Sequence, residues 1–331
     1  MLKIALIDDY AHVALASADW ARLDGKAEIT VFDAHLSEEE AAAALAPFDV
    51  LCTIRERMAL PRTLIERLPN LKLVTIIGAR LTNLDLEAAT ERGVIVAHSG
   101  MRGPGLMNLG AATPELTWGL LIATVRDIAG QDRRMREGLW QDKVGMVLGG
   151  RTLGLLGLGR IGKQMAKYGQ AFGMQVIAWS QNLTAEAAAA EGVERVEKDE
   201  LFSRSDVISI HLILSGRTRG LVTGRELRLM KPTAFLINTS RGPIVVEQDL
   251  IAALRDRAIA GAGLDVFDQE PPPVDHPLRS MDNVTLTPHL GYATAETLAA
   301  FYADSLEAIE AFADGAPIRV SNPEALNRVA T

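Results

Sequence analysis

The sequence predicts an α/β protein with two doubly wound parallel sheets, and three observations lead to this class. Strand-like and helix-like segments alternate from the N-terminus to about residue 97, and the alternation starts again at about residue 151. The chain has 331 residues, a length that suits about two domains. It is 48% hydrophobic and 23% charged, as a globular protein with a full core should be. Because strands that alternate with helices form parallel sheets covered on both faces, each half is expected to be one such sheet.

In the first lobe, short apolar runs predict strands and amphipathic segments between them predict helices. The strands are expected at Lys3–Asp8, Glu28–Phe32, Val50–Ile54, Leu73–Ile77 and Val94–Ala97, and the helices at Glu38–Ala46, Pro61–Leu68 and Leu84–Arg92. Ser37 and Glu40 have the spacing of a capping box at the first of these helices. The single cysteine, Cys52, lies in the third strand and is most simply a small core residue.

A glycine-rich segment, Ser99–Gly110, has no apolar period and predicts a loop or a crossing linker. After it, Thr113-Pro114-Glu115 opens a long helix that can continue through Arg126, and a second helix can follow as far as Trp140. One face of the long helix is apolar and can pack either on a core or on a partner subunit. That face holds Leu116, Leu120, Leu121, Ala123 and Thr124.

In the second lobe, six strands with helices between them form a complete doubly wound set. The strands are expected at Leu153–Leu156, Gln175–Trp179, Val207–His211, Ala234–Asn238, Gly261–Asp265 and Val284–Thr287, and the helices at Ile161–Phe172, Ala185–Ala190, Asp199–Phe202, Gly224–Leu229 and Gln248–Asp256. The tail helix, Thr294–Ala313, is expected to cross back onto the first lobe. The predicted domains are therefore residues 1–99 with 294–331, and residues 100–293, with a cleft between the lobes.

The most informative motif is Gly157-Leu-Gly159-Arg-Ile-Gly162, which follows a predicted strand and opens a predicted helix. In that context the pattern G-x-G-x-x-G indicates a Rossmann dinucleotide-binding site rather than an ordinary glycine-rich turn. The first glycine allows a tight turn, the second lets the backbone approach a pyrophosphate, and the third lets helix and strand pack closely. The N–H groups and the positive end of the helix then face the phosphates.

Three further stretches put an ionisable side chain on the turn after a predicted strand. They are Asn238-Thr-Ser-Arg241-Gly242, Asp265-Val-Phe-Asp-Gln-Glu270 and Leu286-Thr-Pro-His289-Leu-Gly291. Ligands of doubly wound sheets bind at these carboxyl ends of strands. Taken singly, each residue has a plainer interpretation: Arg241 as a surface ion-pair residue, Glu270 as the end of a strand and His289 as a loop histidine.

These stretches, together with Gly157–Gly162, resemble the D-isomer-specific 2-hydroxyacid dehydrogenase family over about residues 3–312. The resemblance implies a Rossmann domain inserted in a flavodoxin-like substrate domain, with NAD or NADP in the cleft. It also implies an oxidoreductase that interconverts a small 2-keto acid and its D-2-hydroxy acid, usually as a homodimer. Hydroxypyruvate, glyoxylate, 3-phosphoglycerate and bulkier 2-keto acids all fit this class.

The family pattern places the catalytic residues at Arg241, Glu270 and His289. Reduction of a 2-keto acid needs a hydride on carbon and a proton on oxygen. Histidine can supply the proton because it titrates near neutral pH, and a nearby carboxylate favours the charged ring. A planar donor such as arginine suits the carboxylate and carbonyl of the substrate. By the resemblance, then, His289 donates the proton, Glu270 is its acidic partner and Arg241 holds the substrate.

The family pattern also assigns binding residues. The substrate-carboxylate loop falls at Gly78, Ala79 and Arg80. Asp265 matches the position that holds the nicotinamide carboxamide, and His211 lies beside the adenine pocket. The expected cofactor-binding set is Gly157, Gly159, Arg160, Ile161, Gly162, Ser180, Gln181, His211, Thr239, Ser240, Asp265 and Gly291. Of the other histidines, His98 lies near the predicted hinge, where a substrate contact is conceivable, whereas His12, His35 and His276 have no such setting.

The sequence departs from the family pattern in two informative places. Ser180-Gln181-Asn182 ends the second strand of the Rossmann unit without the acid that usually binds the ribose hydroxyls of NAD, and without an arginine for a 2′-phosphate. NAD is therefore favoured only slightly, and dual use of NAD and NADP is the working hypothesis. The segment Ser99–Gly110 is longer than the family linker, and it either shapes the substrate pocket or is a surface excursion.

Charge and composition exclude several other classes. The net charge of −8 argues against a nucleic-acid partner. The sequence has no cysteine and histidine cluster with zinc spacing, no long apolar span and no signal peptide, so we expect a cytoplasmic protein that needs no metal. Two alternatives stay open: a non-enzymatic NAD(H)-sensing interaction protein, and a phosphite or formate type of dehydrogenase from the same family. Formate enzymes pair the histidine with glutamine, so Glu270 argues against formate.

Overall fold

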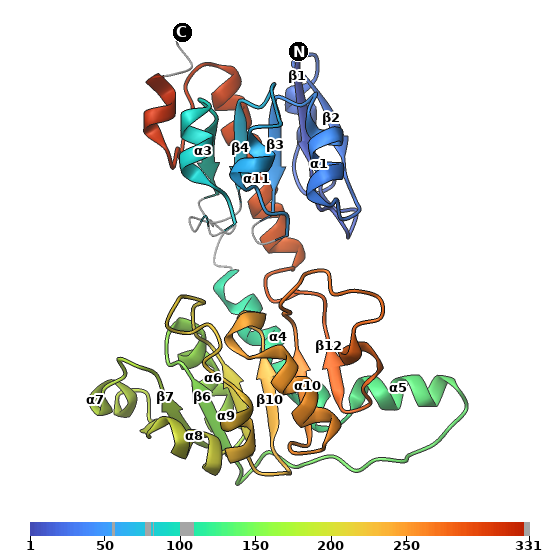
Figure 1. Cartoon of the computed structure of the whole chain (residues 1–331), viewed down its shortest axis with the longest axis vertical. Coiled ribbons are helices and arrows are strands. Elements are labelled where there is room, and N and C mark those ends of the chain that lie inside the picture. The colour runs from blue at the N-terminus through green and yellow to red at the C-terminus, as the bar shows by residue number, and fades with distance from the viewer. Residues whose placement is uncertain (55–56, 77–80, 82, 100–108, 328–331) are drawn as a thin grey trace. The chain divides into compact units, whose positions relative to one another are not determined.

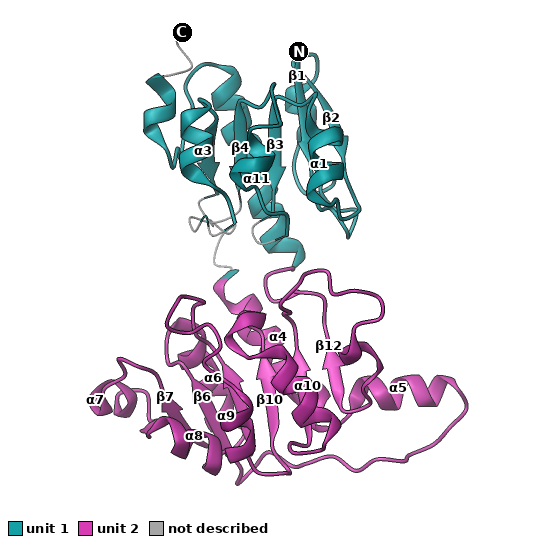
Figure 2. Ribbon diagram, in the orientation of Figure 1, with its two compact units in different colours: residues 1–109, 294–331 teal, residues 110–293 magenta. Residues whose placement is uncertain are grey.

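The structure is a computed structural model that describes residues 1–54, 57–76, 81, 83–99 and 109–327 (Figure 1). The chain forms two compact units, Met1–Leu109 with Thr294–Thr331 and Gly110–Ala293 (Figure 2). The C-terminal segment therefore belongs to the same unit as the N-terminus. No helix in the described ranges is long and apolar enough to cross a membrane.

Unit 1 contains a five-stranded sheet in the order β2-β1-β3-β4-β5, in which each strand is parallel to its neighbours. The strands are β1 (Leu2–Leu6), β2 (Ala27–Val31), β3 (Val50–Thr53), β4 (Leu73–Ile76) and β5 (Ile95–His98). Strands β3 and β4 are buried at every position, which explains their continuous apolar sequence. All five expected strands are confirmed, with small shifts at their ends.

The helices of unit 1 are α1 (Glu38–Leu45), α2 (Arg62–Ile65), α3 (Leu86–Glu91) and α11 (Ala295–Ala313), with short 3₁₀ turns at Trp20–Leu23 and Pro323–Asn327. The expected capping box of α1 is confirmed: the Ser37 side chain accepts from the N–H of Glu40, and the Glu40 carboxylate accepts from the N–H of Ser37 at 2.8 Å. Helix α11 contacts β4 and β5, so the tail helix packs on unit 1 as expected. Cys52 is buried in the core.

Unit 2 contains a seven-stranded sheet in the order β12-β11-β10-β9-β6-β7-β8, again with parallel neighbours. The strands are β6 (Thr152–Leu156), β7 (Gln175–Trp179), β8 (Glu194–Arg195), β9 (Val207–Ile210), β10 (Phe235–Asn238), β11 (Gly261–Leu264) and β12 (Val284–Leu286). The six expected strands are present, and the expectation of six was one too few. Strand β8 has two exposed, charged residues, so it has no apolar pattern and exists only through its pairing with β7.

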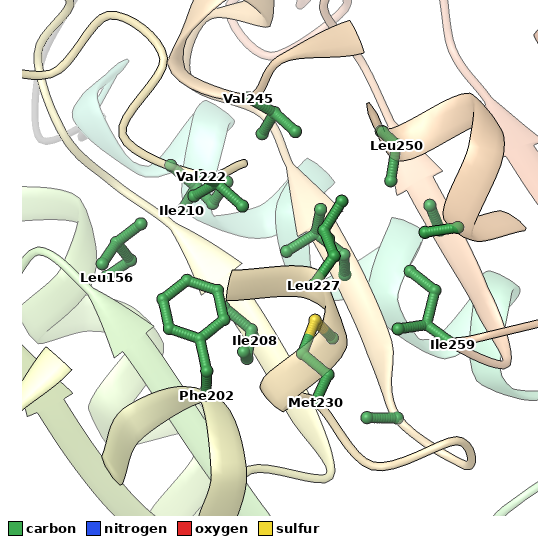
Figure 3. Packing of buried hydrophobic residues seen from close by; sticks show 14 of the residues in the cluster. Leu156, Phe202, Ile208, Ile210, Val222, Leu227, Met230, Val245, Leu250 and Ile259 are labelled. Atoms are coloured by element: carbon green, nitrogen blue, oxygen red, sulfur yellow. The ribbon is translucent and has the colours of Figure 1, made fainter. Parts of the chain in front are cut away.

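The helices of unit 2, all except α5 (Ile128–Arg136), cover this sheet. They are α4 (Ala112–Val125), α5 (Ile128–Arg136), α6 (Arg160–Ala171), α7 (Ala185–Ala189), α8 (Lys198–Arg204), α9 (Gly224–Leu229) and α10 (Glu247–Arg255), with short 3₁₀ turns at Gly242–Ile244 and Pro277–Ser280. Apolar side chains of α8, α9 and α10 meet those of β6, β9 and β10 in one core (Figure 3). Phe202 and Leu227 are fully buried there. Burial of each such side chain stabilises the fold by about 1.5–3 kcal/mol.

Helix α4 packs on unit 2 itself. Its apolar face therefore contacts a core, which is the first of the two alternatives, core or partner subunit, that the sequence left open. Leu120 and Leu121 are buried, and the helix contacts β10, β11 and α6. Leu116 and Ala123 are only half-buried. The following helix, α5, ends at Arg136 rather than Trp140, and it extends away from the body of unit 2 (Figure 1). The segment after it returns to that body, where the N–H of Met146 donates to the carbonyl of Val125 at 3.1 Å.

Candidate active site

The glycine motif forms the turn between β6 and α6, and its three glycines have different surroundings. Gly157 has a φ of 108°, in the region that favours glycine, and a Cβ there would lie 2.7 Å from the carbonyl oxygen of His211. A Cβ on Gly162 would lie 2.1 Å from the carbonyl oxygen of Gly157. A Cβ on Gly159 would meet nothing within 4 Å. No side chain caps α6 at Gly159, so its first N–H groups lie beside open space and fit a pyrophosphate.

The expected site residues of unit 2 follow adjacent strands at one edge of the sheet. Because the strands are parallel and neighbouring, their carboxyl ends lie at that same edge. In sheet order, the strands β12, β11, β10, β9, β6 and β7 lead into His289, Asp265, Thr239 with Arg241, His211, Gly157 and Ser180.

The side chain of Asn238 holds the turn after β10 through two hydrogen bonds to the backbone of that turn. Its amide donates to the carbonyl of Arg241 at 3.0 Å, and its oxygen accepts from the N–H of Ser240 at 3.0 Å. The Ser240 hydroxyl donates to the carbonyl of Leu212, which ties this turn to the segment after β9. Thr239 shares a buried 2.6 Å hydrogen bond with Thr117 of α4. The backbone beside Arg241 is therefore held from three directions.

The loops that carry Arg241 and Glu270 touch each other at Gly242. A Cβ on Gly242 would lie 2.1 Å from the carbonyl carbon of Phe267 and 2.6 Å from the N atom of Asp268. Only a glycine allows this approach. The position of Arg241 is thus coupled to the loop after β11.

Glu270 and His289 form the central pair of the site. The Nδ1 atom of His289 lies 2.5 Å from Oε2 of Glu270, and the other carboxylate oxygen accepts from the N–H of Phe267 at 2.9 Å. The two side chains are 17% and 22% exposed. Because Nδ1 faces the carboxylate, Nε2 is the ring nitrogen left for proton exchange with a substrate.

Asp265 organises the loop that carries His289. Its carboxylate accepts from the N–H of Leu290 at 2.7 Å, from the N–H of Gly291 at 2.9 Å and from the hydroxyl of Thr287 at 2.6 Å. Its carbonyl accepts from the N–H of His289 at 2.9 Å. His289 has a φ of 53°, a strained conformation for a residue other than glycine, and these contacts hold it there. Burial raises the pKa of the Asp265 carboxyl, and the Thr287 hydroxyl, the two N–H groups and His289 oppose that rise.

Asp265→Asn is expected to lower kcat for substrate reduction by about 100-fold, because an amide offers one acceptor oxygen where the loop presents three donors. The misplaced loop would carry His289 away from its working position. Steady-state kinetics check this, and Thr287→Val, which removes one of the three donors, should have a smaller effect. Unchanged turnover in Asp265→Asn would show that these bonds do not position His289.

His211 directly follows β9, one residue beyond the observed end of that strand, and it lines the turn rather than presenting a charge. Its Nε2 lies 2.8 Å from the hydroxyl of Ser209, and burial lowers its pKa to about 3. The ring is therefore neutral at physiological pH. His98, by contrast, lies in unit 1, where its Nδ1 is 3.0 Å from the hydroxyl of Ser321.

The remaining expected residues are distributed as follows. Ser180 is half-buried and Gln181 exposed at the end of β7, and Arg160 donates to the carbonyl of Gly110 at 3.4 Å. Gly78, Ala79 and Arg80, and most of the segment Ser99–Gly110, lie outside the described residues. No group of three or more acidic, histidine or cysteine side chains that could hold a metal ion occurs within the described ranges.

Comparison with known proteins places this site in a family. The family model described as "D-isomer specific 2-hydroxyacid dehydrogenase, NAD binding domain" matches residues 118–291. The chain belongs to the D-isomer-specific 2-hydroxyacid dehydrogenases. It is an NAD-dependent oxidoreductase that interconverts 2-keto acids and D-2-hydroxy acids.

Relatives of this dehydrogenase cover most of its length. A glyoxylate reductase of Aeropyrum pernix is 40% identical over 76% of each chain. A hydroxypyruvate reductase of Blautia hydrogenotrophica is 32% identical over 97% of this chain and 100% of that enzyme. A phosphoglycerate oxidoreductase structure from Vibrio cholerae is 34% identical, covers 96% of this chain and 100% of its own, and superposes with a TM-score of 0.87.

The structure of the dehydrogenase adds residues that sequence reasoning left without a role. Thr287 and Thr117 hold Asp265 and Thr239, and Gly242 lets two site loops touch. His276, which appeared to have no functional setting, lies 3.0 Å from Glu247. Gly242 and Thr287 carried a sequence signal, since each lies in one of the three stretches that follow predicted strands.

Proposed function

We propose that this dehydrogenase reduces a small 2-keto acid, such as glyoxylate or hydroxypyruvate, with His289 as the proton donor. The observation that carries the proposal is the 2.5 Å contact between His289 and Glu270 at the strand ends that also bear Arg241 and the glycine turn. The names of the relatives support these two substrates, and they also make a phosphoglycerate-like acid a member of the candidate set.

Each residue has a distinct part in the proposed mechanism. Bound NADH supplies the hydride. Arg241 binds the carboxylate and the carbonyl oxygen of the substrate through paired N–H donors. His289, protonated, gives its Nε2 proton to that oxygen as it gains charge, and Glu270 stabilises the positive ring and holds its orientation. In the opposite direction, neutral His289 takes the hydroxyl proton.

Cofactor and substrate positions follow from the same assignments. The α6 N-terminus and Gly159 hold the pyrophosphate, while Thr239, Ser240, Asp265 and Gly291 lie on the neighbouring strand ends, where the nicotinamide half is expected. Gly78, Ala79 and Arg80 of unit 1 are proposed to bind the substrate carboxylate through backbone N–H groups. These roles rest on the family pattern and on the strand order.

A panel of 2-keto acids with NADH tests the proposal. Glyoxylate, hydroxypyruvate, 3-phosphohydroxypyruvate and a bulkier acid such as phenylpyruvate would be compared by kcat/KM, with formate and phosphite assayed in the oxidative direction. Glyoxylate or hydroxypyruvate should give the highest values. If none of the acids leads to oxidation of NADH, the NAD(H)-sensing alternative is favoured. If phosphite is the only active substrate, the alternative of a phosphite dehydrogenase is favoured.

We further propose that the enzyme uses both NADH and NADPH. Ser180, Gln181 and Asn182 follow β7 without a carboxylate to repel a 2′-phosphate, and Gln181 and Asn182 are exposed. The ratio of kcat/KM for the two cofactors is expected to stay below about 1000-fold. Ser180→Asp should lower kcat/KM for NADPH by roughly 10-fold or more and leave NADH nearly unaffected, because it restores like-charge repulsion. A wild-type preference above about 1000-fold for either cofactor would contradict dual use.

A homodimer is proposed from α5 and the segment that follows it in unit 2. Between Ile128 and Val147 six large apolar side chains are 50–91% exposed: Ile128, Met135, Leu139, Trp140, Val144 and Val147. Trp140 and Met135 line a groove of about 570 Å³ together with Ile122. Ion pairs of Arg134 with Asp127 and Asp142 hold the segment in this shape. An apolar surface of this kind is typical of a subunit interface, and a second copy of the chain is the proposed occupant.

Trp140→Glu with Val144→Glu is expected to convert the dimer to a monomer, because two buried charges cannot be accommodated at an apolar interface. Light scattering after gel filtration should show twice the chain mass of 35.7 kDa for the wild type and the single mass for the variant. Leu15→Glu, at an exposed apolar residue of unit 1, is the matched control and should remain dimeric. A monomeric wild type would contradict the proposal.

The cytoplasmic location expected from the sequence stays a prediction.

A further inference from the structure

A second carboxylate–imidazole pair lies in unit 2 beside the one assigned to catalysis. Nε2 of His276 is 3.0 Å from Oε1 of Glu247, and the two side chains are only 11% and 17% exposed. Glu247 is the first residue of α10, and His276 precedes the 3₁₀ turn Pro277–Ser280. Neither residue belongs to the expected site, and the proposed mechanism does not use them.

The ring of His276 is fixed by its own loop. Its Nδ1 accepts from the N–H of Leu278 at 3.4 Å, and its backbone N–H donates to the carbonyl of Pro273 at 3.1 Å. With Nδ1 as the acceptor, Nε2 is the nitrogen that carries the proton and donates to Glu247. The side chain is therefore a bridge from the loop to α10.

Glu247 holds the same loop at a second point. Its other oxygen accepts from the N–H of Asp268 at 3.4 Å. Asp268 and His276 flank Glu270, so the two contacts lie on either side of the catalytic carboxylate. The charge of Glu247 also acts on Asp268. Burial raises the pKa of the Asp268 carboxyl most and Glu247 raises it further, while Arg219 and His276 oppose the rise.

Further hydrogen bonds hold the loop between Asp268 and His276. Arg279 donates to the carbonyls of Pro272 and Pro273, each at 2.9 Å. On the other side, Phe267 donates its N–H to Glu270, and the Phe267–Asp268 backbone meets Gly242, the neighbour of Arg241. A shift at Asp268 would thus move both Glu270 and the turn that carries Arg241.

We propose that Glu247 and His276 are positioning residues: they hold the loop from Phe267 to Ser280 so that Glu270 stays on Nδ1 of His289. They act through Glu270 and touch neither substrate nor cofactor. The inference rests on the proposed roles of Glu270 and His289, and it adds a supporting pair from α10 to that catalytic pair.

A double-mutant cycle tests the inference. His276→Ala should lower kcat for 2-keto acid reduction about 10-fold, because a loosened Glu270 no longer holds the ring of His289 in its working orientation. Substrate KM and the Kd for NADH should change less than about twofold, since the proposal assigns this pair no contact with substrate or dinucleotide. In a Glu270→Gln background the same substitution should have almost no further effect on kcat.

Companion variants separate positioning from general damage. His276→Gln keeps a donor near the place of Nε2 and should restore most of the activity lost in His276→Ala. Glu247→Gln provides a second approach if His276→Ala folds poorly, and His12→Ala, at a side chain that is 71% exposed, should behave as wild type. An equal loss from His276→Ala with and without Glu270, or no loss in kcat at all, would overturn the inference. Wild-type activity of Glu270→Gln alone would instead overturn the proposed catalytic pair.

Discussion

His289→Gln is expected to lower kcat for 2-keto acid reduction by about 10²–10⁴-fold, the range that general acid catalysis contributes. Glutamine can donate a hydrogen bond to the substrate oxygen, but it cannot transfer a proton to it. In the structure Nδ1 of His289 lies 2.5 Å from Oε2 of Glu270, and Asp265 holds the His289 backbone at its φ of 53°. Contacts within unit 2 therefore orient the imidazole. The loss should therefore appear in kcat rather than in substrate KM.

Binding of NADH separates this effect from unfolding. The dinucleotide is expected on the turn Gly157–Gly162, so the Kd for NADH measured by fluorescence should be that of the wild type. Turnover within a few-fold of the wild type would exclude His289 as the proton donor and leave the reaction to another group.

Arg241→Lys is expected to lower kcat/KM by about 10²–10³-fold, because lysine keeps the charge but loses the planar pair of N–H donors. Breaking a charged hydrogen-bonded contact of this kind typically costs 2–5 kcal/mol, and each 1.4 kcal/mol is tenfold. The backbone of Arg241 is fixed by Asn238 and by the close packing of Gly242, so lysine would start from the same place but could not reproduce the geometry.

The control for this prediction is an arginine of unit 1 that has no assigned part in the site. Arg22→Lys in unit 1, where Arg22 pairs with Glu310, should leave kcat/KM unchanged. The Arg241 variant should bind NADH normally, since the arginine is assigned to the substrate. A wild-type kcat/KM for Arg241→Lys would show that a point charge is enough, and that the bidentate contact is not made.

Much of the fold was predictable because parallel strands are buried on both faces. Runs such as Val50–Thr53 and Val207–Ile210 are apolar at nearly every position, so their sequence alone marks them as strands. Strand β8 was not predictable, since Glu194 and Arg195 are exposed and pair with β7 only after the chain has folded. The end of α5 at Arg136 was likewise missed, because the exposed segment that follows it has no core to set its period.

The site divides in the same way. The motif around Gly157–Gly162 is contiguous, and its glycines are required by local backbone geometry, so the motif alone indicated a dinucleotide. The carboxyl ends of adjacent parallel strands bring Arg241, Asp265 and His289 to one edge, which the order of predicted strands also implied. These conclusions depend on short-range chemistry that a linear pattern records.

Other features depend on contacts between residues far apart in the chain, and for these only the folded structure is informative. Glu247 and His276 are 29 residues apart, yet their side chains meet. The pair of Glu270 and His289, 19 residues apart, was instead implied by the family pattern, and the structure shows its two side chains in contact. A lone histidine before proline has no local signal of such a partner, which is why His276 was set aside. The sequence therefore specified the reaction class and the pairing of Glu270 with His289 through its motifs. Only the packing of distant loops brought Glu247 onto His276, because such a contact leaves no local pattern in the sequence.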